Sequence, residues 1–273
     1  MKAAVVQFQS ELGQVVKNAE HISVVIDDVM KHHPDCRLIV FPEMCLYGYA
    51  ELERLYDPDY SEKADSALKR VCAAAGKNRV PVVAGFGRRD KVLGGLCNSI
   101  AYISRDGNII CTYDKMHLIE QERTIFEKGH EYVCVETEFG KAGMLICWDC
   151  IFPEPSRLYA MNGVSLLIVS AAWEHPFEEQ WETALKARAL DNGIFVLGAN
   201  RVGQDGPAVF PGGSMAIDGL GRIVARTSDN GTSYAVCDID TKTIRPEQAQ
   251  FGAPLQDLRR QSYDVRHIKS YRG

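Results

Sequence analysis

The sequence lacks the features that would place it in a membrane or on a nucleic acid. No uninterrupted apolar run is long enough to cross a bilayer. The first residues carry a short apolar run without a small-residue cleavage site, which predicts a first strand and not a signal peptide. Basic residues are not in excess, because 31 Lys and Arg stand against 36 Asp and Glu. The net charge of -5 therefore offers no footprint for nucleic acid or an anionic membrane.

The sequence also lacks the cysteine pattern of a zinc or disulfide protein. Its nine cysteines are odd in number, and most stand singly inside apolar segments. No pair of Cys-x-x-Cys motifs is present to suggest structural zinc. Reduced, isolated thiols are typical of a cytosolic protein, so we expect a cytoplasmic enzyme.

The order of the apolar segments predicts an α/β fold in a single domain over residues 1–273. A strand at 2–8, an amphipathic helix at 14–33 and a buried strand at 37–41 form a βαβ pattern, which implies a parallel pair with a right-handed crossover. No linker, composition shift or repeat divides the chain. Strands outnumber helices and each helix has one apolar face, so we expect two packed sheets with helices on their outer faces.

The remaining segments continue this alternation. A Gly/Pro-rich loop at 203–213 precedes a β-meander, and the polar tail from residue 241 is expected to pack on a partner subunit. The other predicted elements are a helix capped by Ser61 and ending near Asn78, a strand at 80–87, hairpin strands ending with 109–114, a charged loop at 116–129, strands at 132–138 and 142–147, a helix at 154–162, a strand at 164–170, a helix at 178–192 and a strand at 194–200.

The segment at residues 143–157 has the pattern of a nucleophile site. The apolar run Met144-Leu145-Ile146 ends at Cys147, and Pro153 stands at the head of a segment with helical spacing. This pattern predicts a buried strand, then a loop and a helix. A thiol at such a strand end is held rigidly by the sheet and faces an open crevice.

Polar residues follow three apolar strand ends. Glu43 comes after the run at 38–41, Lys115 after the strand at 109–114 and Cys147 after Ile146. In α/β sheets, sites form outside the carboxyl ends of the strands. Glu43 could take the thiol proton, and Lys115 could stabilise the thiolate and a later oxyanion. Each residue taken singly is as well explained by packing or solvation, and spacing alone does not establish that the three meet.

Longer motifs surround these three residues. They are Phe41-Pro42-Glu43, then Tyr113-Asp114-Lys115-Met116-His117-Leu118, and then Leu145-Ile146-Cys147-Trp148-Asp149 through Phe152-Pro153-Glu154. In this order and at these separations they resemble the three signatures of the nitrilase (carbon–nitrogen hydrolase) superfamily. Further matches at 188–192, 200–203 and 210–214 extend the resemblance over nearly the whole chain.

The resemblance implies a fold and a set of catalytic residues. The fold would be a four-layer α-β-β-α sandwich of two mixed sheets with helices outside, assembled as a homodimer or higher oligomer. The family's catalytic Glu, Lys and Cys fall on Glu43, Lys115 and Cys147. Many members use a second Glu seven or eight residues after the Lys, which Glu122 matches best, although Glu120 is close. No metal or organic cofactor is implied.

The implied reaction is hydrolysis of a non-peptide C–N bond in a small amide. Glu43 would accept the proton of Cys147, and the thiolate would attack the carbonyl. Lys115 and the backbone N–H of Trp148 would meet the oxyanion. Ammonia would leave a thioester, which water oriented by Glu122 would hydrolyse.

The substrate is less closely defined by the motifs. The Cys-Trp-Asp sequence at 147–149 is similar to that of N-carbamoylputrescine amidases, and its Asp149 favours an amide or carbamoyl substrate over a nitrile. We therefore expect an amide first, an N-carbamoyl amine or amino acid second and a nitrile third. The candidate substrate-binding residues are Trp148 and, after a strand end where family substrates are bound, Trp173, Glu174 and His175.

Three other interpretations use the same residues. Cys147 and Cys150 fit a Cys-x-x-Cys redox motif, although no thioredoxin-sized βαβ unit surrounds them. His117 could instead pair with Cys147 as in papain, since it follows Lys115 by two residues. A catalytically silent binding scaffold is the third, but such a relative should have lost one of the three motif residues, and this chain keeps them all.

Overall fold

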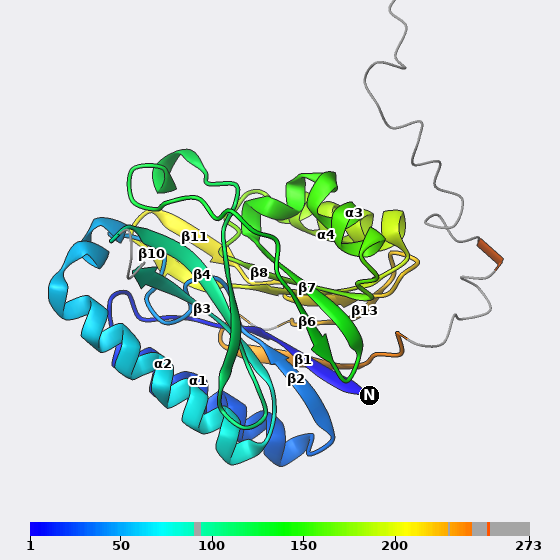
Figure 1. The fold of residues 1–273 in the computed structure, drawn as a ribbon, viewed down its shortest axis with the longest axis horizontal. Coiled ribbons are helices and arrows are strands. Elements are labelled where there is room, and N and C mark those ends of the chain that lie inside the picture. The colour runs from blue at the N-terminus through cyan, green and yellow to red at the C-terminus, as the bar shows by residue number, and fades with distance from the viewer. Residues whose placement is uncertain (90–93, 229, 242–249, 252–273) are drawn as a thin grey trace, which may run out of the picture.

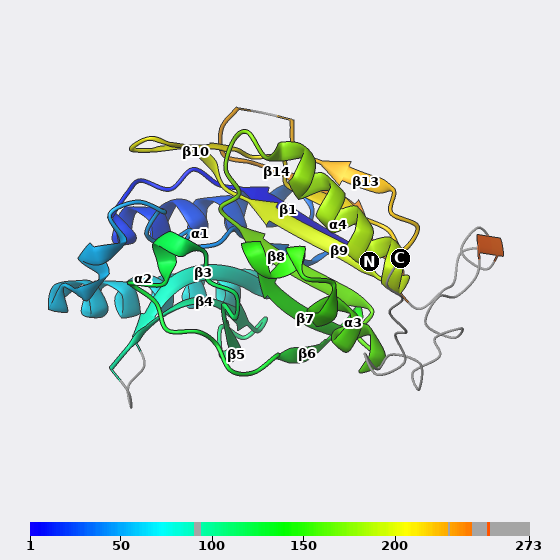
Figure 2. The same ribbon diagram turned by 90° about the horizontal axis from the view of Figure 1, so that it is seen from above.

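A computed structural model describes residues 1–89, 94–228, 230–241 and 250–251. Two six-stranded sheets pack against each other in this part of the chain (Figure 1). Helices α1 (Val15–His32) and α2 (Pro58–Asn78) cover one sheet, and α3 (Pro153–Met161) and α4 (Glu178–Asn192) cover the other (Figure 2). The prediction of an α-β-β-α sandwich is confirmed.

The first sheet contains the N-terminal strands. Its members are β1 (Lys2–Gln7), β2 (Cys36–Val40), β3 (Val82–Arg89), β4 (Leu96–Ile103), β5 (Ile109–Asp114) and β14 (Ser233–Asp238). Their order is β14-β1-β2-β3-β4-β5. Strands β1, β2 and β3 are parallel, as the βαβ pattern predicts, and the outer pairs are antiparallel. The first sheet is therefore mixed.

The second sheet repeats this plan. Its members are β6 (Cys134–Thr137), β7 (Gly140–Ile146), β8 (Leu166–Ala171), β9 (Phe195–Asn200), β12 (Met215–Ile217) and β13 (Ile223–Arg226). Their order is β13-β12-β9-β8-β7-β6, with β7, β8 and β9 parallel and the outer pairs antiparallel. Each sheet thus has a parallel centre whose carboxyl ends can supply site residues.

Two hydrophobic clusters hold the layers together. One contains residues of both sheets, such as Val40 and Ile168, and continues beneath α4 through Leu185. The other fills the space between the first sheet and its helices, with Ile22 of α1 and Val71 of α2 fully buried. Long apolar strands buried on both faces are the reason that these segments read as near-continuous hydrophobic runs.

Several local predictions need correction. Helix α2 begins at Pro58, with the Asp57 carboxylate accepting the N–H of Asp59, so Ser61 is not its cap. The loop predicted at 203–213 contains a hairpin of β10 (Val202–Asp205) and β11 (Ala208–Pro211). The predicted meander is divided, because β14 leaves β13 and pairs with β1 of the other sheet.

The predicted tail beyond residue 241 lies outside the described residues, apart from 250–251. Within the described ranges, no helix combines the length and apolarity needed to cross a membrane.

Candidate active site

Glu43 lies just past the carboxyl end of β2. The strand's hydrogen bonding continues to Phe41, whose N–H donates to the Val83 carbonyl, and the Glu43 side chain is fully buried. The turn that follows presses against β3 at Gly85. A Cβ atom there would lie 2.5 Å from the backbone nitrogen of Met44, so glycine is required for this close approach.

Lys115 and Glu122 meet Glu43 in a buried group that we call the Glu–Lys–Glu cluster. The Lys115 Nζ lies 2.8 Å from Glu43 Oε1 and 2.8 Å from Glu122 Oε1, and all three side chains are 0% exposed. Glu122 is the last residue of a short 3-10 helix, η2 (Glu120–Glu122). Glu120, the first residue of this helix, is exposed. The structure therefore places Glu122, and not Glu120, beside the lysine.

Further donors that sequence reasoning missed fix both carboxylates. Asn98 Nδ2 lies 2.6 Å from Glu43 Oε1 and 2.8 Å from Glu122 Oε1. The backbone N–H of Ala172 donates to Glu43 Oε2 at 2.7 Å, and that of Ile119 donates to Glu122 Oε2 at 3.0 Å. The adjacent polar residues Asn98 and Ser99 in the mostly apolar strand β4 are the sequence signal that could identify Asn98.

Cys147 lies where β7 gives way to the 3-10 helix η3 (Cys147–Ile151). Its backbone has a φ of 46°, in the left-handed region that non-glycine residues rarely occupy. Such strain is typical of functional turns. The thiol is free and the residue is 7% exposed. Helix α3 begins with Pro153 directly after this turn, close to where the sequence predicted a helix.

The electrostatic environment leaves Cys147 as a neutral thiol. Burial raises its pKa well above the usual range, Glu43 and Glu122 add to that shift and Lys115 opposes it. Burial also raises the pKa of Glu43, against the pull of Lys115. Burial disfavours the Lys115 ammonium, but the two carboxylates outweigh this and hold its pKa well above the usual range. The site thus pairs a neutral thiol with a carboxylate of raised pKa and a permanent cation.

Asp149 supports the turn. Its carboxylate accepts hydrogen bonds from the Tyr113 hydroxyl at 2.8 Å, the His117 N–H at 2.9 Å and the Ile146 N–H at 3.1 Å. The side chain is 0% exposed. Both oxygens are therefore engaged in holding η3 against β5 and the following loop.

His117 and Cys150 do not have the contacts that a papain-type His117–Cys147 pair or a Cys147–Cys150 redox pair would require. His117 Nδ1 lies 2.8 Å from Asp149, and the ring stacks on Phe152 with centroids 4.0 Å apart. No hydrogen bond joins it to Cys147 in the described structure. Cys150 is a free, fully buried thiol whose pKa burial raises to about 12. These contacts favour neither a papain-type pair nor a redox pair.

Aromatic side chains surround the turn that carries the thiol. Trp148 is 37% exposed, and its ring lies 6.1 Å from that of Trp173 and 6.4 Å from that of Phe152. Trp173 is buried, with its N–H donating to Asn200 Oδ1 and its indole N–H donating to the Phe177 carbonyl. The structure thus brings Trp173 into contact with Trp148, the residue that follows Cys147 in the chain.

The two charged candidates after Trp173 differ from each other. Glu174 is half-buried, and burial raises its pKa. His175 is exposed, and its Nδ1 lies 2.7 Å from Glu178 Oε1 on the following helix. The His175 imidazole thus already has Glu178 as a hydrogen-bond partner at the surface. Glu174 forms no ion pair with the described residues.

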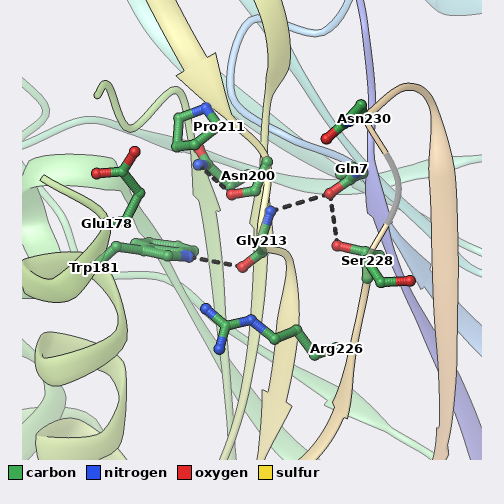
Figure 3. A pocket seen from close by; sticks show the side chains of 11 residues that line it. Gln7, Glu178, Trp181, Asn200, Pro211, Gly213, Arg226, Ser228 and Asn230 are labelled. Atoms are coloured by element: carbon green, nitrogen blue, oxygen red, sulfur yellow. Dashed lines mark hydrogen bonds between the residues drawn. The ribbon is translucent and has the colours of Figure 1, made fainter. Parts of the chain in front are cut away.

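A cavity of about 210 Å³ lies beside α4, lined in part by Gln7, Trp181 and Asn200 (Figure 3). Gln7 Oε1 accepts the Gly213 N–H at 3.0 Å, and the Trp181 indole donates to the Gly213 carbonyl at 3.0 Å. Its described lining includes neither Cys147 nor a member of the Glu–Lys–Glu cluster. Elsewhere in the described ranges, no group of three or more His, Cys, Asp or Glu side chains is arranged to hold a metal.

Fold and site together define a class of protein. A four-layer sandwich presents a thiol on a strained turn. Glu43 and Lys115 follow strand ends and Glu122 lies in η2, and together they form a buried cluster whose charges act on that thiol. These are the chemical groups of a hydrolase that works through a cysteine nucleophile.

Comparison with known proteins identifies the family. The chain matches the carbon–nitrogen hydrolase family over residues 2–247 and belongs to that family, in the nitrilase superfamily. It is 34% identical to a probable nitrilase of Schizosaccharomyces pombe over 92% of this chain and 94% of the relative. It is 33% identical to 2-oxoglutaramate amidase of Bacillus subtilis over 92% and 96% of the two chains. The crystal structure of an amidase from Nesterenkonia sp. has the same fold, with a TM-score of 0.83 at 23% identity over 96% and 94% of the chains.

Proposed function

We propose that this protein hydrolyses a small, non-peptide amide to a carboxylate and ammonia through a thioester on Cys147. The observation that carries this proposal is the fully buried Glu–Lys–Glu cluster, in which Lys115 Nζ lies 2.8 Å from each carboxylate. Curated relatives at 32–33% identity include two amidases, which supports an amide as the substrate class.

Acylation begins with proton transfer. Because the Cys147 thiol is neutral, it needs a base at the moment of attack, and Glu43, with its raised pKa, can accept this proton. An ammonium has three N–H donors. Two of those of Lys115 go to the carboxylates, which leaves one for the oxyanion, together with the backbone N–H of Trp148. Glu43 then returns the proton to the departing ammonia.

Deacylation uses the second carboxylate. The Ile119 N–H donates to Glu122 Oε2 and fixes this carboxylate. Lys115 Nζ bridges the two carboxylates, donating to Glu122 Oε1 and to Glu43 Oε1. Glu122 orients a water molecule toward the thioester, and Glu43 takes the proton of that water. The water oxygen bonds to the acyl carbon, the C–S bond breaks, and Glu43 returns the proton to the departing Cys147 sulfur. The products are the free thiol and a carboxylate.

The proposed substrate-binding residues are Trp148, Trp173 and Glu174. His175, which is exposed and paired with Glu178, would lie at the edge of this group. The two indoles, tilted by 34° with centroids 6.1 Å apart, offer an apolar aromatic surface on the segments that follow β7 and β8. The half-buried Glu174 carboxylate offers a partner for a polar or cationic end of the substrate. N-carbamoyl hydrolysis remains the second candidate, since the same machinery would act on a carbamoyl carbonyl and release carbon dioxide as well.

A substrate panel tests the proposal. Aliphatic amides, ω-amides of dicarboxylic acids, N-carbamoyl amines and nitriles would be assayed for ammonia and carbon dioxide. Ammonia without carbon dioxide from an amide is the expected result. Carbon dioxide release from carbamoyl amines alone would favour the second candidate, and turnover of nitriles alone would contradict the amide proposal.

The pH dependence of turnover follows from the Glu43 environment. Because burial raises its pKa, the carboxylate takes up its proton at a higher pH than an exposed glutamate does. A base must be ionised, so kcat/KM is expected to fall as the pH decreases through this raised value. A pH–rate profile should place the acid limb above the ordinary glutamate pKa of about 4.3. An acid limb at or below that value would argue against Glu43 as the base.

Assembly as a homodimer is part of the proposal. Leu158 and Met161 of α3 and Leu190 of α4 are 51%, 36% and 36% exposed on the outer helical layer. Light scattering should give at least twice the 30.4 kDa chain mass. Leu158→Glu with Leu190→Glu should reduce it to the chain mass, whereas Ile110→Glu, on the exposed part of β5, should not. A monomeric wild-type protein would refute the dimer.

A further inference from the structure

Besides one backbone N–H on each carboxylate, Tyr49 supplies a side-chain contact that distinguishes the two carboxylates of the Glu–Lys–Glu cluster. Lys115 and Asn98 each donate to both Glu43 and Glu122. The Tyr49 hydroxyl donates to Glu122 Oε1 at 2.8 Å. Among the described side chains it is the one hydrogen-bond donor that reaches Glu122 without also reaching Glu43. A mechanism that gives the carboxylates different tasks needs such an asymmetry.

The phenol is suited to act as a permanent donor. Tyr49 is 8% exposed, and burial, with Glu122 and Glu43 nearby, raises its pKa well above the usual range. Its hydroxyl therefore stays protonated over the pH range in which enzymes work. A donor that keeps its proton holds the Glu122 carboxylate in one hydrogen-bonded orientation. The ring also lies 6.0 Å from Lys115 Nζ, which adds a cation–π contact.

A buried ion pair on the β10–β11 hairpin holds Tyr49 in place. Asp205 Oδ2 accepts the backbone N–H of Tyr49 at 2.7 Å, and Arg201 Nη2 donates to Asp205 Oδ1 at 2.6 Å. Arg201 also donates to the Ser10 carbonyl at 3.2 Å. Its guanidinium lies 5.0 Å from the ring centroid of Phe210, on which Tyr49 packs edge-on at 6.0 Å.

Gly48, the residue before Tyr49, packs closely against the Asp205 carboxylate of the Arg201–Asp205 ion pair. Gly48 has a φ of 106°, and a Cβ atom there would lie 3.0 Å from Asp205 Oδ2. The loop can approach the carboxylate only because this residue has no side chain. A continuous path of contacts therefore runs from Arg201 and Asp205 through Tyr49 to Glu122.

We infer that Tyr49 is a positioning residue for Glu122 in thioester hydrolysis, and that the Arg201–Asp205 pair holds Tyr49 in register. This inference rests on the proposed function, because it assigns Glu122 to the water of deacylation. The Tyr49 hydroxyl restrains the Glu122 carboxylate so that its water faces the thioester. It leaves acylation, which depends on Glu43, largely unaffected.

The test is Tyr49→Phe, which removes the hydroxyl and keeps the ring. A hydrogen bond to a charged group is strong enough that kcat should fall about 10- to 100-fold. Since kcat/KM reports acylation here, it should stay within about threefold, and acyl-enzyme should accumulate in intact-mass spectra. Tyr47→Phe is the matched control, because Tyr47 is a buried tyrosine of the same loop whose hydroxyl donates to the Glu51 carbonyl.

A second variant tests the path. Asp205→Asn should lower kcat in the same direction, and combining it with Tyr49→Phe should add little, because both act through one contact. If Tyr49→Phe behaves like Tyr47→Phe, or lowers kcat and kcat/KM together without acyl-enzyme accumulation, the inference is overturned while the proposed function stands. If the wild-type protein forms no acyl-enzyme, both are overturned.

Discussion

Replacing Cys147 by alanine is expected to lower kcat/KM by at least about 10⁴-fold, since removal of a covalent nucleophile leaves only binding and oxyanion stabilisation. The fold should persist, because the change removes one sulfur atom from a residue that is 7% exposed. Ammonia release measures the activity, and thermal unfolding with circular dichroism measures the fold. Undiminished turnover in the folded variant would refute the mechanism.

Cys150→Ala is the matched control for this substitution. Cys150 is a second free thiol three residues away, fully buried, in the same short helix. If it is a packing residue, the variant should keep kcat within a few fold and lose about 1 kcal/mol of stability. Loss of activity equal to that of Cys147→Ala would instead support the Cys-x-x-Cys interpretation.

Lys115→Met is expected to remove both activity and stability. The lysine supplies the positive charge in the fully buried Glu–Lys–Glu cluster. Its removal leaves two carboxylates buried without a counter-charge, which typically costs about 3–5 kcal/mol in the free energy of unfolding. Urea denaturation measures this loss, and activity should fall below detection because the oxyanion loses its ammonium partner.

Two further variants separate charge from packing. Lys186→Met breaks an exposed pair with Glu182 and should cost less than about 1 kcal/mol. Lys115→Met combined with Glu122→Gln removes one orphaned carboxylate and should recover part of the stability without recovering activity. A Lys115→Met protein as stable as Lys186→Met would show that the cluster carries no buried charge.

The sequence predicts that Glu43, Lys115 and Cys147 follow the ends of strands, and the structure places them after β2, β5 and β7. Apolar runs before Glu43 and Cys147 are long enough to be recognised as strands, the strand before Lys115 begins with Ile109 and Ile110, and the family motifs around all three are contiguous. The layers of the fold follow from the same runs, since central parallel strands are apolar on both faces. Both kinds of signal are local in the sequence.

What the sequence does not predict depends on long-range contacts. Tyr49 reaches Glu122 across 73 residues, and Ala172 reaches Glu43 across 129. The strand β14 pairs with β1 although β13 precedes it in the chain, and no alternation of side chains within β14 indicates which sheet it joins. Such pairings are fixed by tertiary packing and not by local pattern.

Asp149 has a structural role that the sequence does not predict. The motif predicts only that Asp149 favours an amide or carbamoyl substrate over a nitrile. In the structure its buried carboxylate also joins Tyr113, His117 and Ile146 around the cysteine turn. These contacts bear on the geometry of the turn, and the preference for an amide or carbamoyl substrate stays a prediction.

The most direct test of the central claim is intact-mass spectrometry of the wild-type protein mixed with an excess of an amide that it turns over, quenched in acid within the first turnover. The expected result is an added mass equal to the acyl group, mapped by proteolysis to the peptide that contains Cys147 and lost in Cys147→Ala. Turnover with the acyl group on another residue, or with no adduct at any time point, would contradict a thioester mechanism at Cys147.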